Sequence, residues 1–220
     1  PFAGGMLARA SYLKCRHSFP YAKFVSVIGA SYLIYGWVSG IAGIAAVSLL
    51  TEGLAHAGEL ILFFVVMLLI LSFCGVMPAV RIPGENPAIR FLNSAVEGWV
   101  LIRKDPTLVT KLALYTAATV LLNGIAFWLA FGALSGGPVS FGVPFVVGIF
   151  FSLSVFIRVT PGNLGVSEAV ATLASEFVGM GAGMGFMVSL LIRAASLIPI
   201  FVLGPLFSLL LTRELTGSRR

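Results

Sequence analysis

Charged residues, cysteine and histidine are scarce in this sequence. Only 10% of its 220 residues are charged, and it contains two cysteines and two histidines. Soluble domains have roughly 25% charged residues. Hydrophobic residues reach 59%, and the mean hydropathy is +1.05. A chain with so little polar surface cannot cover a water-soluble globule. The composition therefore predicts an integral membrane protein and leaves no room for a soluble catalytic domain.

The few residues that usually carry chemistry are poorly placed for it. Cys15 lies in a basic flank and Cys74 in an apolar run, so we expect two free thiols and no metal-ligand spacing. His17 and His56 stand alone near expected span ends, where interfacial side chains are common. No D-x-x-D cluster or serine-glycine-histidine run occurs. We predict no catalytic residue, metal or cofactor. We attribute the net charge of +6 to basic residues in cytoplasmic loops and near anionic headgroups, and we do not expect the protein to bind nucleic acid.

Long apolar runs predict an all-α polytopic membrane protein with about five to six transmembrane helices in a single domain, residues 1–220. At roughly 20 residues a span, the runs cover about 24–50, 60–80, 108–134, 141–157 and 186–211. Proline interrupts the last run at Pro199 and Pro205. The start at Pro1 within a motif-like stretch predicts either that N-terminal spans precede it or that an initiating methionine is removed before Pro1. No basic-then-apolar leader is recognised.

Two spans carry features typical of helix packing. The first has glycines at a four-residue spacing, Gly36 and Gly40, with Gly29 and Gly43 nearby, which predicts a small-residue face for close contact. Asn123 lies near the middle of the third span. A helix–helix hydrogen bond is the usual role of such a residue, and lining a cavity is the alternative.

The distribution of basic residues predicts the orientation of the chain. Residues 1–23 combine a Pro/Gly motif with a basic flank that has no acid, so the positive-inside tendency places them at the cytoplasmic side. Residues 81–107 are predicted to lie in the cytoplasmic interface, with Arg90, Arg103 and Lys104 facing anionic headgroups. The connection with Glu52, His56 and Glu59 has no base and is predicted to be outside.

Residues 158–185 break the apolar pattern. Pro161, Gly162, Gly165 and Gly179 bracket a short helix that carries Glu168 and Glu176. Non-helical backbone at membrane depth is tolerated only inside protein or beside water, so we expect the break to line a cavity. The helix after the break should attract anions at its N-terminus. Its length, roughly 22 Å at 1.5 Å per residue, favours a re-entrant segment, whereas the basic C-terminal tail favours a full crossing.

Arg193 is a cation within the last apolar run. Facing lipid would cost roughly 2.5–3.5 kcal/mol on insertion scales, so it should face the interior and be paired. Glu168 and Glu176 are the nearest carboxylates, and Arg158 competes for them. Two interpretations stay open. The pair either fixes the docking of the broken helix or contacts a polar or charged substrate.

The stretch TPGNLGVSEA, followed by LLIRAASLIPIFVLG, resembles the P-G-G-L-G-V-x-E signature and arginine helix of the lysylphosphatidylglycerol synthase transmembrane-region family, a flippase-like membrane domain. Asn163 replaces the second glycine of that signature, and Met6 replaces an acid in a similar opening motif. The residues that match are Pro161, Gly162, Leu164, Gly165, Val166, Glu168 and Arg193, together with Pro1, Gly5 and Arg9. The two motifs are also similar to each other, which favours an internal repeat with a site at the repeat interface.

This resemblance implies a protein of the prokaryotic cytoplasmic membrane that translocates or binds a phospholipid or a polyprenyl-linked lipid. It implies that Arg9, Arg158 and Arg193 attract a lipid phosphate. Glu168 and Glu176 would hold these arginines or meet a cationic headgroup. Pro161, Gly162, Asn163 and Gly165 would complete the lipid-binding site, and the glycines would let it open. The soluble aminoacyltransferase domain of two-domain members is not in this sequence, so lipid aminoacylation is not expected.

Two rival functions stay open at this point. One is a non-transporting scaffold for a partner glycosyltransferase, and a homo-oligomer is a further kind of assembly. The other is a membrane-embedded enzyme that acts on lipid phosphates, for which the sequence offers no obvious nucleophile beside a general base.

Overall fold

The computed structural model describes residues 21–50, 56–76, 99–100, 102–157 and 160–217, and the single positions 12, 14, 83, 86, 89 and 93. Over this part of the chain the regular structure is helical, with no strand. The helices are α2 (Tyr21–Leu50), α3 (Ala57–Val76), α5 (Pro106–Ser135), α6 (Gly142–Leu153), α7 (Val166–Phe177) and α8 (Ala182–Gly217), with the short 3-10 turns η1 (Ser154–Phe156) and η2 (Pro161–Asn163).

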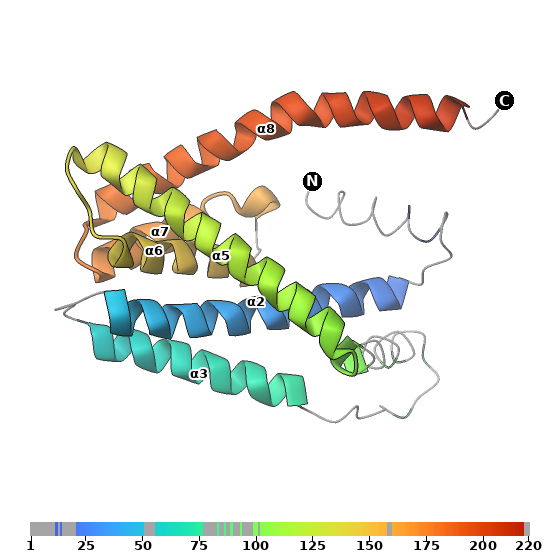
Figure 1. Cartoon of the computed structure of the whole chain (residues 1–220), viewed down its shortest axis with the longest axis horizontal. Helices are drawn as coiled ribbons and strands as arrows, with labels where there is room; N and C mark the ends of the chain where they lie inside the picture. The colour runs from blue at the N-terminus through green and yellow to red at the C-terminus, as the bar shows by residue number, and fades with distance from the viewer. Residues whose placement is uncertain are drawn as a thin grey trace.

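Four of these helices contain a segment long and apolar enough to cross a membrane. The segments are Phe24–Leu49, Ala57–Gly75, Pro106–Ser135 and Ala182–Pro199, and a shorter apolar stretch covers Gly142–Phe156. The predicted all-α membrane architecture is confirmed. The helix α8 continues through Pro199 and Pro205, where an interruption was expected, and its ribbon changes direction part-way along (Figure 1). Proline is tolerated inside transmembrane helices where neighbouring groups satisfy the freed backbone.

Local sequence signals explain where α5 begins and ends. Asp105 has an extended backbone, and its Oδ1 accepts a hydrogen bond from the Leu108 amide at 3.0 Å. Pro106 follows at the first helical position, where a missing N–H costs nothing. At the other end Gly136 adopts φ +68°, the left-handed conformation that ends helices. These signals bound a helix of 30 residues, roughly 45 Å long and sufficient to cross a bilayer.

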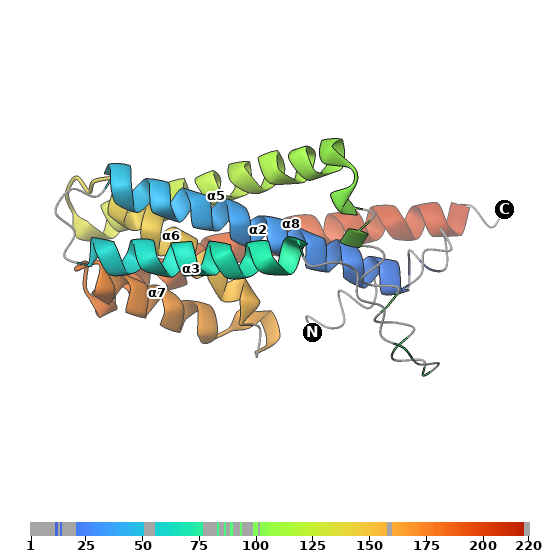
Figure 2. The same cartoon turned by 90° about the horizontal axis from the view of Figure 1, so that it is seen from below.

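The long helices define two ends of the bundle, which we name the His56 end and the Lys104 end. The helices α2 and α5 run toward the His56 end, whereas α3 and α8 run away from it (Figures 1 and 2). Phe177 at the end of α7 packs against His56, with ring centroids 4.5 Å apart, so α7 also ends there. The C-terminal part of α8 therefore lies at the Lys104 end, which the basic residues predict to be cytoplasmic.

The helices α6 and α7 form a hairpin that enters from the His56 end and reverses about half-way along the bundle (Figures 1 and 2). Each has 12 residues, or about 18 Å, so neither crosses a core of ~30 Å alone. This corrects the expectation that residues 141–157 cross the membrane. The hairpin also explains how the 161–180 stretch can be too short to cross while the basic C-terminal tail still lies at the predicted cytoplasmic end. The helix α7 returns the chain to the His56 end, and α8 then crosses to the Lys104 end.

The core forms around α6, which packs against α2, α5 and α7. Its apolar residues are buried on several sides, including Val146, Val147 and Ile149. Glycines let neighbouring helices come close. A Cβ at Gly40 would lie 2.8 Å from the Leu68 side chain of α3, which confirms the predicted small-residue face of α2. Close helix contact supplies the dispersion energy that holds such a bundle together in lipid.

Two residues noted in the sequence make polar contacts within this bundle, and only the contact of Asn123 was predicted. Asn123 of α5 donates through Nδ2 to the Gly148 carbonyl oxygen of α6 at 3.1 Å and to Ser152 Oγ, so the expected helix–helix hydrogen bond is confirmed. Within the predicted interfacial segment 81–107, Arg103 Nη1 donates to the Gly75 carbonyl oxygen at the end of α3 at 3.0 Å. The contact of this segment with headgroups stays a prediction.

Candidate functional site

The break between α6 and α7 is built from residues in the left-handed region of backbone space. Gly162 has φ +67°, Asn163 has φ +58° and Gly165 has φ +82°. A side chain in this region costs roughly 1–2 kcal/mol, a cost that glycine does not incur and that asparagine tolerates better than most residues. Asn163, which replaces a glycine of the family signature, can therefore still adopt the left-handed backbone of the break.

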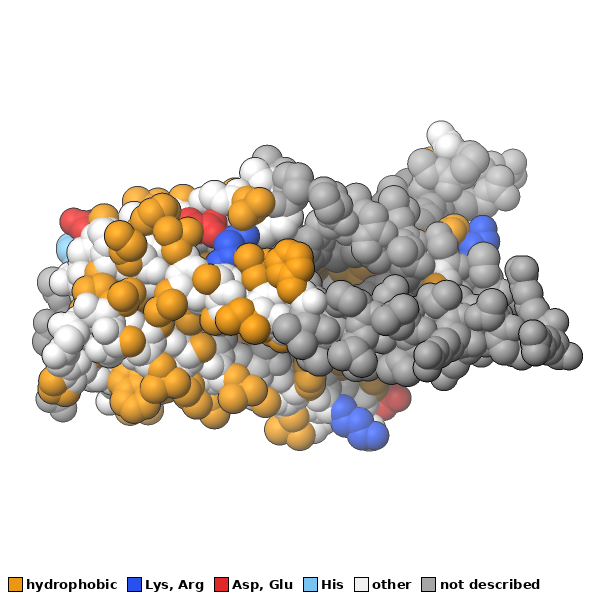
Figure 3. All heavy atoms as spheres, turned by 90° about the horizontal axis from the view of Figure 1, so that it is seen from above, with side chains coloured by type: hydrophobic (Ala, Val, Ile, Leu, Met, Phe, Trp, Pro, Cys, Tyr) orange, Lys and Arg blue, Asp and Glu red, His pale blue; other side chains and the backbone are white. Residues whose placement is uncertain are grey.

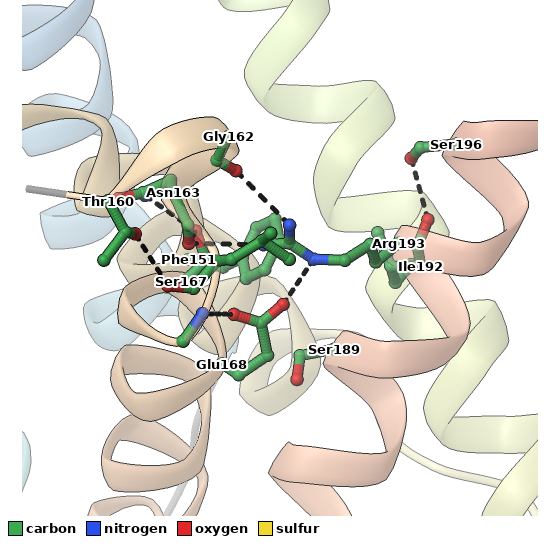
Figure 4. A network of polar contacts seen from close by, with 12 residues as sticks. Phe151, Thr160, Gly162, Asn163, Ser167, Glu168, Ser189, Ile192, Arg193 and Ser196 are labelled. Atoms are coloured by element: carbon green, nitrogen blue, oxygen red, sulfur yellow. Dashed lines mark hydrogen bonds and ion pairs between the residues drawn. The ribbon is translucent and has the colours of Figure 1, made fainter. Parts of the chain in front are cut away.

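The Asn163 side chain also ties the break to the end of α6. Its Nδ2 lies 2.7 Å from Ser167 Oγ and 2.9 Å from Ser154 Oγ, and 3.1 Å from the Ser154 carbonyl oxygen (Figure 4). Ser154 and Ser167 are buried, and their hydroxyls are 3.1 Å apart. Sequence reasoning missed these two serines, although a serine on each side of a Pro/Gly break is a signal that could have indicated them.

Replacing Asn163 tests both roles of this residue. The Asn163→Ala variant should be destabilised by about 2–4 kcal/mol, because it strains the left-handed backbone by about 1–2 kcal/mol and leaves buried serine hydroxyls without their donor. The Asn163→Gly variant loses only the side-chain bonds and should retain about 1–2 kcal/mol more stability than the alanine variant. Unfolding titrations in detergent measure the difference, and equal stability of the two variants would contradict this explanation.

Glu168 closes the N-terminus of α7 with its own carboxylate. It lies in the first turn and is 5% exposed, and its Oε2 accepts a hydrogen bond from the Gly165 amide at 2.8 Å. A negative charge at a helix N-terminus is favourable, by typically 0.3–1 kcal/mol for exposed groups. The anion expected at this helix end is therefore supplied by the protein itself.

Arg193 reaches from α8 across to the break. Its Nε forms an ion pair with Glu168 Oε1, which confirms the predicted pairing. Its Nη1 and Nη2 donate to the carbonyl oxygens of Gly162 and Asn163, each at 3.3 Å (Figure 4). At 1.5 Å per residue, Arg193 lies about 17 Å along α8, close to the middle of a ~30 Å core. One guanidinium thus holds both sides of the break at mid-membrane depth.

The ion pair borders a cavity of about 580 Å³ between α7 and α8. Glu168 and Arg193 are the charged residues in its wall, and Leu164, Leu173 and Phe186 are among its apolar residues. In the space-filling view, acidic and basic side chains lie side by side within a largely apolar described surface (Figure 3). The expectation that the break lines a cavity is confirmed.

The structure does not bring every predicted site residue to this cavity. Glu176 lies about 12 Å further along α7, and its Oε2 accepts a hydrogen bond from the Ala182 amide at 2.6 Å. It fixes the turn between α7 and α8 and does not contact Arg193, so the structure places it away from the cavity that Glu168 and Arg193 line. Arg9 and Arg158 lie outside the described residues, so their predicted roles stay predictions.

Comparison with protein families matches residues 1–204 to one family, described as the lysylphosphatidylglycerol synthase TM region. The match includes both Pro/Gly motifs and the part of α8 that carries Arg193. No curated protein and no solved structure gives a significant match.

Proposed function

This chain belongs to the lysylphosphatidylglycerol synthase TM region family, and we propose that it binds a phosphate-bearing membrane lipid beside Arg193 and translocates it across the membrane. The lipid is a phospholipid or a polyprenyl-linked lipid. The protein works in a cytoplasmic membrane with its Lys104 end inside, and it is a transporter and not an enzyme. It acts as a single chain, as a homo-oligomer or beside a glycosyltransferase that uses the same lipid.

One observation carries this proposal. A guanidinium and a carboxylate line a cavity with mostly apolar walls near the middle of the membrane. Burying charges at this depth is expensive, and such groups usually mark the path of a polar substrate. A binding site near the bilayer midplane, built from broken helices, is also typical of secondary transporters.

The contacts of Arg193 provide a mechanism for opening the site. Its Nη1 and Nη2 donate to neutral carbonyl oxygens at 3.3 Å, which is longer than the 2.7–2.9 Å of charge-assisted bonds. A lipid phosphate would bind both nitrogens more strongly and in bidentate geometry. It would displace the carbonyls of Gly162 and Asn163 while Glu168 keeps Nε. The break would then be free to move at Gly162 and Gly165, as hinges do in domain closure.

Replacing Glu168 and, separately, Glu176 by glutamine tests the assignment. The Glu168→Gln variant should lower the translocation rate about 10–100-fold, because it removes a charge-assisted contact worth roughly 1.5–3 kcal/mol to Arg193. The Glu176→Gln variant keeps an amide oxygen for the Ala182 amide and should retain the normal rate. Liposomes that contain headgroup-labelled phospholipid or polyprenyl phosphate measure the movement of each lipid between leaflets. Equal losses in both variants would refute the assignment.

A non-transporting anchor for a glycosyltransferase is the second candidate. It is supported by the fact that all three guanidinium nitrogens of Arg193 have a partner within the protein. On this reading the wild-type protein would not accelerate lipid movement in liposomes, whereas Arg193 variants would lose a bound glycosyltransferase. Formation of a chemically altered lipid in the same liposomes would instead indicate a lipid-phosphate enzyme.

A further inference from the structure

A second, apolar groove runs along the other side of α7, between α3 and the α6–α7 hairpin. Two cavities of about 780 Å³ and 330 Å³ share Glu59, Phe63, Phe150 and Val170 in their walls, so they form one continuous groove. Arg193 and Glu168 do not line it. The groove is therefore separate from the charged cavity, and its description does not depend on that cavity.

The groove follows the membrane normal through one leaflet. Its wall on α3 extends from Glu59 to Leu71, about 18 Å at 1.5 Å per residue, and half of a ~30 Å core is about 15 Å. It begins at the His56 end and finishes beside Ile157, next to the break. Only 11% of the apolar span of α3 is buried, less than in the other three spans. The groove thus opens toward lipid.

We propose that this groove binds one hydrocarbon chain of a phospholipid from the leaflet at the His56 end. Water does not fill large apolar cavities, because it finds too few polar partners there. The groove is about as long as one leaflet is thick and opens to the bilayer along α3. A single hydrocarbon chain fits this shape, because it lies along the membrane normal and can bend around the walls.

The side chains of the groove suit such a chain. The rings of Phe63 and Phe150 lie with centroids 5.3 Å apart and form the middle of the groove. Met67, which lines the groove below them, has an unbranched side chain that adapts to irregular apolar partners. Ser154 at the far end donates its hydroxyl to the Phe151 carbonyl oxygen at 2.6 Å, so its polar group is already satisfied.

The polar mouth of the groove selects the headgroup. Glu59 lines the groove, and its Oε2 lies 2.6 Å from His56 Nδ1 on the exposed surface. Phe177 packs on the His56 ring and holds the pair at the mouth. A carboxylate can accept about four hydrogen bonds, so Glu59 can also accept from a headgroup ammonium. The geometry favours phosphatidylethanolamine over a lipid with an anionic headgroup.

Photolabelling in bilayers tests the inference directly. The wild-type protein is placed in nanodiscs of phosphatidylethanolamine and phosphatidylglycerol, one of which carries a photoreactive diazirine in its acyl chain, and the labelled residues are identified by mass spectrometry. We expect adducts on Phe63 and Met67 about tenfold above those on Leu69, which faces lipid outside the groove, a preference equal to ~1.4 kcal/mol. Equal labelling of the two faces of α3 would overturn the inference.

Matched variants separate the groove from the general lipid surface. Val66→Trp fills the groove and should lower labelling of Met67 about tenfold, whereas Leu69→Trp, at another exposed position of α3, should not. The Glu59→Gln variant should reduce the preference for the phosphatidylethanolamine probe, and labelling indifferent to headgroup would refute that assignment. Labelling of Leu69 without adducts on Phe63 and Met67 would also overturn the inference, because a second copy or another chain segment would then cover the groove. The translocation assay of Glu168 variants fails or succeeds independently of these results.

Discussion

The Arg193→Met variant is expected to lose lipid translocation and to be destabilised by about 3–5 kcal/mol. Removing one partner of a buried ion pair leaves an uncompensated charge, which has a cost of this size. Glu168 is 5% exposed and would keep that charge. The carbonyl oxygens of Gly162 and Asn163 would also lose their donors. Unfolding titrations in detergent measure the stability, and labelled-lipid liposomes measure the translocation.

Combining Arg193→Met with Glu168→Gln separates a structural role from a transport role. The double variant has no buried charge, and the glutamine can still accept a hydrogen bond from the Gly165 amide. Replacing both partners of a buried pair by neutral groups is often neutral for stability, so most of the lost stability should return. Translocation should stay absent, because no guanidinium remains to bind phosphate. If translocation returned together with stability, Arg193 would only dock the break.

The second large effect is expected at Gly185, where α8 crosses α7. A Cβ at this position would lie 2.6 Å from the Ala171 carbonyl oxygen and would also clash with Ser175 Cβ. Because a backbone atom cannot move alone, Gly185→Ala should push α8 away from α7 and cost about 1–3 kcal/mol. Arg193 lies about 12 Å further along α8, so the same shift should separate it from Glu168 and lower translocation.

Gly183→Ala is the matched control for this prediction. A Cβ there meets nothing within 4 Å of itself, although the residue lies in the same helix. Alanine is a better helix former than glycine by about 1 kcal/mol, so this variant should be as stable as the wild type or slightly more stable. Both variants are compared by unfolding in detergent. A Gly185→Ala variant as stable as Gly183→Ala would show that the close crossing of α7 and α8 is not required.

Much of the fold could be predicted because apolar runs of bilayer length leave few alternatives. The first predicted span, 24–50, corresponds to α2, and 108–134 corresponds to α5. The pairing of Arg193 with Glu168 could also be predicted, since a cation in an apolar run needs an interior partner. A Pro/Gly break at residues 161–165 was also predicted, and the structure builds it from left-handed backbone at Gly162 and Asn163.

The remaining features depend on how the helices are arranged in space. Sequence spacing made Glu168 and Glu176 equally good partners for Arg193, and only the direction of α7 decides between them. Because α7 returns to the His56 end, Glu176 lies beside the α7–α8 turn, away from the guanidinium. Hydropathy also cannot distinguish a short span from one arm of a hairpin, so the reversal between α6 and α7 was missed. The capping role of Glu168 could not be predicted either. It depends on Glu168 lying in the first turn of α7, and the sequence did not define where that helix begins.

The distance between lipid phosphorus and the Arg193 guanidinium tests the central claim most directly. Solid-state NMR of the protein in lipid bilayers can measure it after ¹⁵N labelling of arginine, with the Arg193→Met variant to assign the signal. We predict that lipid phosphorus lies close to Nη1 and Nη2, because its phosphate oxygens accept hydrogen bonds from both nitrogens at N···O distances of about 2.7–2.9 Å. A guanidinium that stays bound only to Glu168 and the carbonyl oxygens of the break, with no lipid phosphorus nearby, would contradict the account.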